Sequence, residues 1–235
     1  MGFLKEFFNN VFTEEDAARQ AETAMPESGF ESVSESDLEA HLGISRYGDF
    51  VLTDAVRPSY DLDVVPSAGY RHDRYRDEQS RQDVPVLMAA VTRDELFETF
   101  IELMEPLGQV VDVVIESSHN YSRAGRQECY REHIDMPILQ SILYDFEDLL
   151  VNDGCTGVAV LNPGLPQEVQ FDEHKLLLVY GADLSQYERV LDRNAVPCRD
   201  DMRFITEAEH VHSTNEEYIQ QFEELKMRLG MDGDF

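Results

Sequence analysis

The sequence of 235 residues has few basic residues and no long apolar run. It holds 19 Lys and Arg against 48 Asp and Glu, which gives a formal net charge of −29. Binding to a nucleic-acid backbone needs a stripe of basic side chains, so we expect no nucleic-acid partner. No segment reaches the roughly 18–20 apolar residues that a membrane-spanning helix needs, so no membrane span is predicted.

Cysteine and the common catalytic motifs are also scarce. Cys129, Cys155 and Cys198 form no Cys-x-x-Cys pair and no even-numbered framework, which excludes a disulfide scaffold. The first residues lack a basic region followed by an apolar stretch, so no secretory signal is predicted. The chain also has no phosphate-loop, dinucleotide-binding, nucleophile-elbow or zinc-protease motif. These absences predict a reduced, cytoplasmic protein and point to no cofactor.

What the chain does contain is enough apolar sequence for a core. Hydrophobic residues make up 42% of the chain, which excludes full disorder. Acidic residues outnumber basic ones both in residues 1–83 and in residues 84–235, so the charge comes from no single tail. Such a charge keeps a protein soluble, or provides a docking face for a basic partner. The signals for regular structure sharpen after residue 83, which predicts an N-terminal extension (1–83) and a core domain (84–235).

The extension begins with an amphipathic pattern. Its apolar side chains recur every three or four residues, as on one face of a helix. They are Phe3, Leu4, Phe7, Phe8, Val11 and Phe12. Such a face must dock on the chain's own domain, on a second copy or on another protein. Lys5 is the only cation of this helix, so an anionic membrane would attract it weakly.

The end of the extension, residues 57–83, is interpreted as a polar, irregular arm. Pro58, Pro66 and Gly69 interrupt any periodicity. The arm is locally basic and aromatic, with Arg at positions 71, 74, 76 and 81. It is expected to contact a partner or an anion, or to pair with the acidic domain of the same chain.

The core domain begins with a strand, a helix and a second strand. Residues 84–91 are continuously apolar, as in a strand buried on both faces. Thr92 and Glu95 form a capping box before a helix that Gly108 ends. A β-branched strand follows at 110–115. This spacing predicts a βαβ unit with parallel strands.

Further strands and helices complete the predicted domain. We expect a polar loop at 117–135, a helix over 137–150, a strand at 156–161, one long strand or a hairpin over 169–180, a short strand at 202–205, and helices after Asp183 and Ser213. The order predicts an α/β or α+β fold with a mixed sheet of about five strands. A ferredoxin-like two-layer sandwich is favoured over three layers because the third and fourth strands read as antiparallel.

The polar loop is the first candidate site. It follows the end of a predicted parallel strand, where open α/β sheets place ligands. Its candidate ligand-binding residues are His119, Tyr121, Arg123, Arg126, Cys129, Arg131 and His133. The arginines suit a carboxylate or phosphate. Cys129 and His133, one helical turn apart, suit a shared metal or a nucleophile–base pair. The competing interpretation is a polar connecting loop.

A second candidate is a metal site at His210 and His212. Histidines at alternate positions share one face of a strand, and imidazole is a common zinc ligand. The sequence identifies no third ligand, so a surface loop with ordinary histidines competes with this interpretation. Asp172-Glu173-His174 is interpreted as a turn or an exposed strand edge.

Two hypotheses for function follow. The first is a non-catalytic, cytoplasmic α/β module that binds a protein partner or a second copy of itself through the N-terminal helix. The second is an enzyme or a sensor of a small ligand or anion that uses residues 117–135. The absence of catalytic motifs favours the first.

Overall fold

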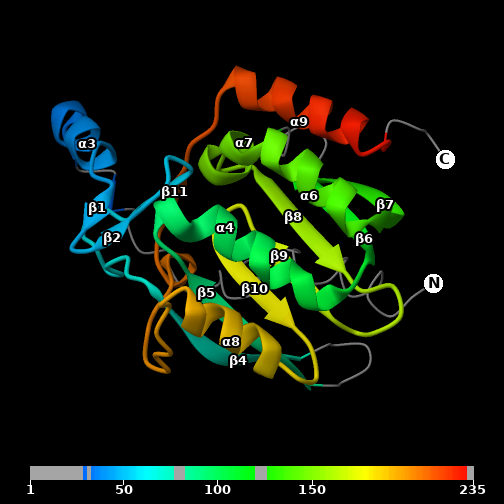
Figure 1. Ribbon diagram of the computed structural model, residues 1–235. Coiled ribbons are helices and arrows are strands. Elements are labelled where there is room, and N and C mark those ends of the chain that lie inside the picture. The colour runs from blue at the N-terminus through cyan, green and yellow to red at the C-terminus, as the bar shows by residue number, and fades with distance from the viewer. Residues whose placement is uncertain (1–28, 31–32, 77–82, 120–125, 232–235) are drawn as a thin grey trace.

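The computed structural model describes residues 29–30, 33–76, 83–119 and 126–231 (Figure 1). The phenylalanine-rich helix predicted for residues 1–12 lies outside these ranges. An interaction module that docks through this helix therefore stays a prediction.

One sheet of seven strands forms the centre of the structure (Figure 1). Every pair of neighbouring strands in it is antiparallel. The strands are, from one edge to the other, β4 (Gly69–Arg76), β5 (Asp83–Ala90), β10 (Leu176–Tyr180), β9 (Glu168–Phe171), β8 (Thr156–Leu161), β6 (Val110–Ser117) and β7 (Gln127–Asp135).

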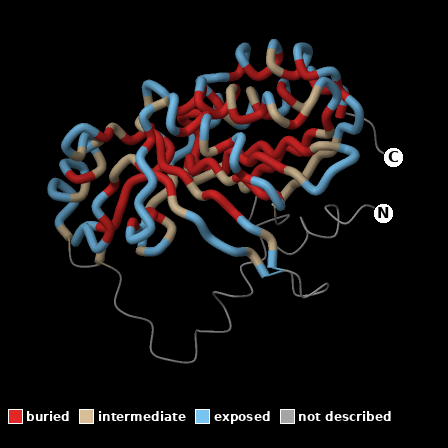
Figure 2. Tube along the Cα trace, turned by 60° about the horizontal axis from the view of Figure 1, so that its bottom comes forward, coloured by how far each residue is buried: buried red, intermediate tan, exposed pale blue. Residues whose placement is uncertain are grey.

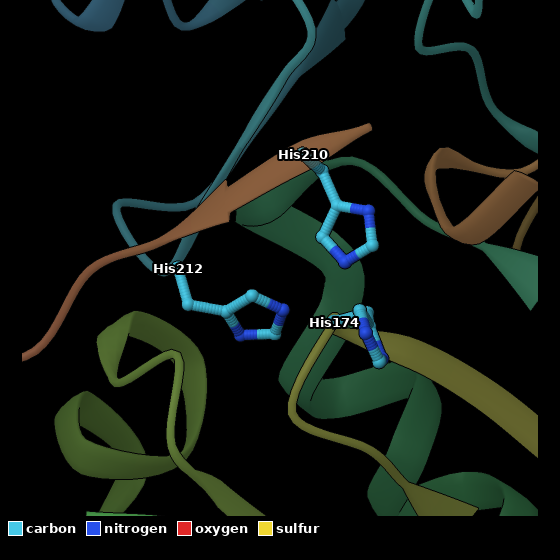
Figure 3. A group of neighbouring side chains, drawn as sticks. All are labelled: His174, His210 and His212. Carbon is cyan, nitrogen blue, oxygen red and sulfur yellow. The ribbon is translucent and has the colours of Figure 1, made fainter. Parts of the chain in front are cut away.

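Two small antiparallel ribbons lie outside the main sheet. The first pairs β1 (Arg46–Tyr47) with β2 (Phe50–Val51). The second pairs β3 (Val56–Pro58) with β11 (His210–His212), two segments more than 150 residues apart along the chain. This second ribbon lies near the end of the sheet where β9 turns into β10 (Figure 3).

Six α-helices occur in the described ranges. They are α3 (Glu35–Leu42), α4 (Arg93–Met104), α6 (Met136–Asp145), α7 (Glu147–Asn152), α8 (Ser185–Arg193) and α9 (Glu216–Arg228). Helices α4, α6, α7 and α8 lie over one face of the sheet, and α9 lies against α7 (Figure 1). Two 3₁₀ turns occupy Glu105–Leu107 and Ile205–Glu207. No helix of the described residues is long and apolar enough to cross a membrane.

The main hydrophobic core lies between the sheet and these helices. Strand side chains such as Leu87 and Val113 meet helix side chains such as Phe100 and Leu139 there. The alternation of the strands places Met88 on the other face, where a smaller cluster gathers at one end of the sheet. This smaller cluster contains Phe50, Leu52, Val56, Ala90, Leu176, Met202, Phe204 and Ile205. Figure 2 shows the buried residues concentrated along the strands and the inner sides of the helices.

The α+β class is confirmed, but the sheet has seven strands where about five were expected. The two main-sheet strands missing from the expectation are β4 and β7, which are the two edges of the sheet. Both have mostly partly or fully exposed side chains, so their sequences resemble polar loops. Strand β4 pairs along its whole length with β5, and so joins the predicted extension to the predicted core.

The expected βαβ unit does not pair its two strands with each other. Strands β5 and β6 are separated by β10, β9 and β8. The chain of antiparallel pairs makes β5 and β6 point the same way, but α4 carries the chain past three strands before β6 begins. The periodicity of apolar residues predicts the strands and helices themselves. Which strands become neighbours depends on β8, β9 and β10, which follow later in the chain and lie between β5 and β6. The ferredoxin-like arrangement is not confirmed.

Three local expectations are also corrected. The helix expected over 137–150 is broken at Phe146, whose φ of −119° is not helical, into α6 and α7. The last expected strand, 202–205, is an irregular segment leading to a 3₁₀ turn. Cys129 and His133 lie on strand β7 rather than on a helix, so they are not one helical turn apart.

Candidate functional site

Three histidines from two distant parts of the chain meet at one end of the sheet. His210 and His212 alternate on β11, where His210 lies opposite Pro58 and His212 opposite Val56 of β3. This alternation places both rings on the same face of the ribbon. His174 comes from the turn between β9 and β10 and faces them (Figure 3).

The three rings form a compact triangle. Their centroids are separated by 4.7 Å between His174 and His212, 4.9 Å between His174 and His210, and 5.1 Å between His210 and His212. One ring nitrogen of each lies within 4.8 Å of those of the other two. All three residues are half-buried.

Each ring is oriented by a hydrogen bond at its Nδ1 atom. His210 Nδ1 lies 2.8 Å from the carbonyl oxygen of Ala208, and His212 Nδ1 lies 2.5 Å from that of Gly154. A carbonyl oxygen only accepts, so both Nδ1 atoms carry the proton. In the neutral rings the lone pair is therefore on Nε2.

His174 is oriented by a carboxylate. Its Nδ1 lies 2.8 Å from Oδ2 of Asp172, whose Oδ1 accepts the backbone N–H of Leu176 at 2.8 Å. Burial acts to raise the pKa of Asp172, but His174, this N–H group and Lys175 outweigh it, so the pKa is lowered. Asp172 is thus ionised at neutral pH and accepts the Nδ1 proton of His174. Nδ1 is thus engaged in all three rings, which leaves Nε2 as the nitrogen available to a ligand.

The three imidazoles differ in basicity. Burial acts to lower the pKa of His174, but the Asp172 carboxylate reverses this effect and the pKa is raised. Burial lowers the pKa of His210 and of His212, and the charge of His174 lowers both further. His210 and His212 are therefore neutral at pH 7, which is the form of imidazole that binds a metal ion.

The loop between α7 and β8 contains Gly154, whose carbonyl oxygen accepts the hydrogen bond from His212. A Cβ atom on Gly154 would lie 2.3 Å from the carbonyl oxygen of Ala55, so only glycine fits there. The Gly154 N–H donates to the Ser213 carbonyl at 2.8 Å, and the Ser213 N–H donates to the Ala55 carbonyl at 2.8 Å. These bonds hold the Gly154 carbonyl in place for His212.

Buried polar groups anchor the same loop. The His119 and Asp153 side chains are 2% and 0% exposed, with His119 Nε2 lying 3.0 Å from Asp153 Oδ2. The Thr156 hydroxyl donates to that carboxylate at 2.5 Å, and Lys175 Nζ donates to the Thr156 carbonyl at 2.9 Å. Burial lowers the pKa of Lys175 to about 8. These contacts fix the loop between the histidine triangle and the core.

A mainly apolar cavity borders the triangle. His174 is one of its lining residues, beside the side chains of the smaller hydrophobic cluster. The others include Phe50, Leu52, Leu176, Phe204 and Ile205. The cavity places an apolar surface beside one of the three imidazoles.

The residues predicted as a ligand site at 117–135 lie in separate environments. His119 is buried against Asp153, whereas Arg126 lies between Glu116 at 3.4 Å and Glu173 at 2.5 Å. Cys129 packs against the main core. Tyr121 and Arg123 lie outside the described residues.

The remaining two residues of that set lie further along β7. Arg131 donates to the Leu229 carbonyl at 3.2 Å, so it joins β7 to the end of α9. The His133 side chain is 68% exposed, with Nδ1 3.9 Å from Asp112. The described members of the set thus occupy different surroundings on the strand, and ligand binding by this set stays a prediction.

The metal-site candidates His210 and His212 do lie together, and His174 supplies the third imidazole that sequence reasoning missed. His174 does lie in a turn, as its interpretation had it, but this turn faces β11. The only sequence signal was a histidine two residues after an aspartate, which is the spacing of the observed Asp172–His174 hydrogen bond. Comparisons with family models, curated proteins and solved structures found no match for this chain, so its function is argued from this geometry.

Proposed function

We propose that the protein binds a divalent transition-metal ion, with Zn²⁺ the best match, through Nε2 of His174, His210 and His212. The observation that carries this proposal is the common orientation of the three rings. Each Nδ1 is engaged by a carbonyl or carboxylate oxygen, and one ring nitrogen of each histidine lies within 4.8 Å of those of the other two. Metal-binding histidines in proteins have this arrangement, in which a second group orients the ring and sets its tautomer.

The alternative interpretation is a group of ordinary, half-buried histidines. It leaves the lone pairs on Nε2 of the neutral His210 and His212 without a hydrogen-bond donor among the described residues. Among the described residues, no hydrogen bond satisfies any of the three Nε2 atoms. A cation at the centre of the triangle would accept the lone pairs of all three rings in their neutral form.

The donor set favours a catalytic centre over a structural one. Structural zinc sites are closed by four protein ligands and are rich in cysteine, whereas catalytic sites have three ligands and an open position. In the ranges that the structure describes, no fourth His, Cys, Asp or Glu joins this group. Zinc in such a site lowers the pKa of a bound water to about 7.

We therefore propose metal-dependent hydrolysis or hydration as the reaction class. Asp172 and the Ala208 and Gly154 carbonyls orient the ligands in this proposal. The apolar cavity that His174 borders supplies a surface for a substrate beside the open position.

The test is a Zn²⁺ titration of the metal-free, full-length protein followed by calorimetry. We expect one high-affinity equivalent to disappear in each of His174→Ala, His210→Ala and His212→Ala, because each substitution removes one of three ligands. His133→Ala is the matched control, since this exposed histidine belongs to no such group. Equal Zn²⁺ binding by the wild type and all three ligand variants would overturn the proposal.

A further inference from the structure

A second group of ligand-type side chains lies on the surface beside the edge strand β4. It consists of His72 on β4 together with Cys198 and Asp200, which follow α8. The distances are 4.0 Å from His72 Nδ1 to Cys198 Sγ, 3.9 Å from His72 Nδ1 to Asp200 Oδ1, and 3.8 Å from Cys198 Sγ to Asp200 Oδ1. Nitrogen, sulfur and oxygen donors thus form a nearly equilateral triangle.

Backbone hydrogen bonds hold the two segments together. The Tyr70 N–H donates to the Pro197 carbonyl at 2.9 Å, and the Arg199 N–H donates to the Tyr70 carbonyl at 2.7 Å. These bonds form a parallel bridge between Tyr70 and Cys198. The contact is close, because a Cβ on Gly69 would lie 3.1 Å from the Pro197 carbonyl oxygen. The main chain therefore fixes Cys198 beside β4 without help from a ligand.

The His72 ring is oriented toward the other two donors. Its Nε2 atom lies 2.6 Å from Oε1 of Glu188 on α8. This contact leaves Nδ1 to face Cys198 and Asp200. An ionised carboxylate on the far nitrogen is the usual second group behind a metal-binding histidine. Glu188 thus contacts His72 at Nε2, whereas Asp172 contacts His174 at Nδ1.

The triangle is slightly wider than the donor spacing of a tetrahedral zinc site. Zinc lies about 2.0–2.3 Å from nitrogen, oxygen and sulfur ligands, which places the donor atoms of a tetrahedron about 3.3–3.6 Å apart. The observed separations exceed this range by a few tenths of an ångström. The three residues are exposed, so small side-chain rotations close the difference.

We propose that His72, Cys198 and Asp200 form a second binding site for a thiophilic divalent ion such as Zn²⁺, separate from the three-histidine centre. On binding, the Cys198 thiol releases its proton to solvent and the thiolate donates an electron pair to the ion, with no change of oxidation state. Water completes the coordination, since the site faces solvent. Its mixed donors and exposure make it an exchangeable site, and it does not depend on the function proposed above.

The test uses Co²⁺ as a spectroscopic probe of the full-length, metal-free protein. A thiolate ligand gives a sulfur-to-cobalt charge-transfer band in the near ultraviolet, which three imidazoles cannot give. We expect this band in the wild type and its loss in Cys198→Ser and in His72→Gln. We also expect one fewer bound Co²⁺ in these two variants by elemental analysis. Circular dichroism checks that the variants remain folded.

Two controls separate this site from the others. The band is expected to persist in His174→Ala, because the three-histidine centre contains no sulfur. It is also expected to persist in Cys155→Ser, although Cys155 lies near His119 and Asp153. A wild type without the band would overturn the proposal. A band that survives Cys198→Ser but is lost in Cys155→Ser would also overturn it, since the thiolate would then belong to the buried cysteine.

Discussion

At the scale of single residues, the candidate metal centre depends on the group that forms a hydrogen bond with Nδ1 of each histidine. Oxygens of Asp172, Ala208 and Gly154 contact Nδ1 of the three histidines and so favour the tautomer with the proton on Nδ1. In the neutral rings Nε2 is then the nitrogen that can bind a metal ion. Asp172 is the strongest of the three orienting groups because it is charged and buried.

Asp172→Asn is expected to weaken Zn²⁺ binding by about 10- to 100-fold, the usual effect of removing an outer-sphere partner. The amide keeps an oxygen for the Leu176 N–H but no longer carries the charge that favours a donating Nδ1 on His174. Competition with a fluorescent zinc chelator measures the change in affinity. Asp112→Asn is the control, since Asp112 lies near His133 and away from the triangle. An unchanged affinity in Asp172→Asn would show that this carboxylate does not orient a ligand.

At the scale of elements, the edge strand β4 and the β3–β11 ribbon carry three of the six proposed ligands. Strand β4 carries His72, and β11 carries His210 and His212. Edge strands and short ribbons expose polar side chains without exposing the core, which makes them suitable carriers of ligands. The loop between α7 and β8 links the ribbon to the main sheet through Gly154.

Gly154→Ala is expected to lower the free energy of unfolding by about 1–3 kcal/mol, the usual cost of forcing extra atoms into a packed site. The added methyl group would meet the Ala55 carbonyl at 2.3 Å, and the backbone must move. The carbonyl that orients His212 moves with it, so Zn²⁺ affinity falls as well. Chemical denaturation and zinc titration measure the two effects.

Gly164→Ala is the matched control for this substitution. The Cβ atom added there would lie 3.6 Å from its nearest neighbour, Oδ1 of Asn162, which is an ordinary contact. Wild-type stability in both alanine variants would contradict the close approach of the chain at Gly154.

At the scale of the whole molecule, the sheet buries carboxyl groups in a strongly acidic protein. Burial raises the pKa of Glu168 on β9 to about 8, although Gln170 donates a hydrogen bond to it. Burial also raises the pKa of Glu116 on β6 to about 8, against the opposing effect of Arg126. Both carboxyl groups are thus largely protonated at neutral pH in the folded chain.

These raised pKa values predict that the two groups lower stability as the pH rises. Between pH 4.5 and about 8 the folded chain holds protons that the unfolded chain, with an ordinary glutamate pKa of 4.5, has released. Each group then lowers the free energy of unfolding by up to about 1.4 kcal/mol per pH unit. The stability that each protonated carboxyl group contributes is fully present below pH 4.5, and it is lost as the pH rises from 4.5 to about 8.

Glu168→Gln tests this origin, because glutamine resembles the protonated carboxyl group and does not titrate. Urea denaturation at a series of pH values is expected to give a shallower decrease in stability than in the wild type. Glu224→Gln, an exposed substitution on α9, is expected to leave the slope unchanged. Parallel profiles for the wild type and Glu168→Gln would contradict a raised pKa at Glu168.

The sequence by itself determined the elements whose side chains follow a clear apolar period. The strands β5, β6, β8, β9 and β10, and the helices α4, α8 and α9, lie close to their predicted positions because burial imposes a period of 2 or 3.6 on them. Local pattern also placed His210 and His212 on one face of a strand. It did not reveal β4 or β7, whose exposed residues lack that period.

Only the tertiary structure decided which elements became neighbours, and with them both candidate metal centres. His174 meets His210 because the β9–β10 turn faces a ribbon formed by β3 and β11. Cys198 meets His72 because two backbone hydrogen bonds join segments more than 120 residues apart. Contacts across such separations follow from the packing of the whole core, and no local period of the sequence encodes them.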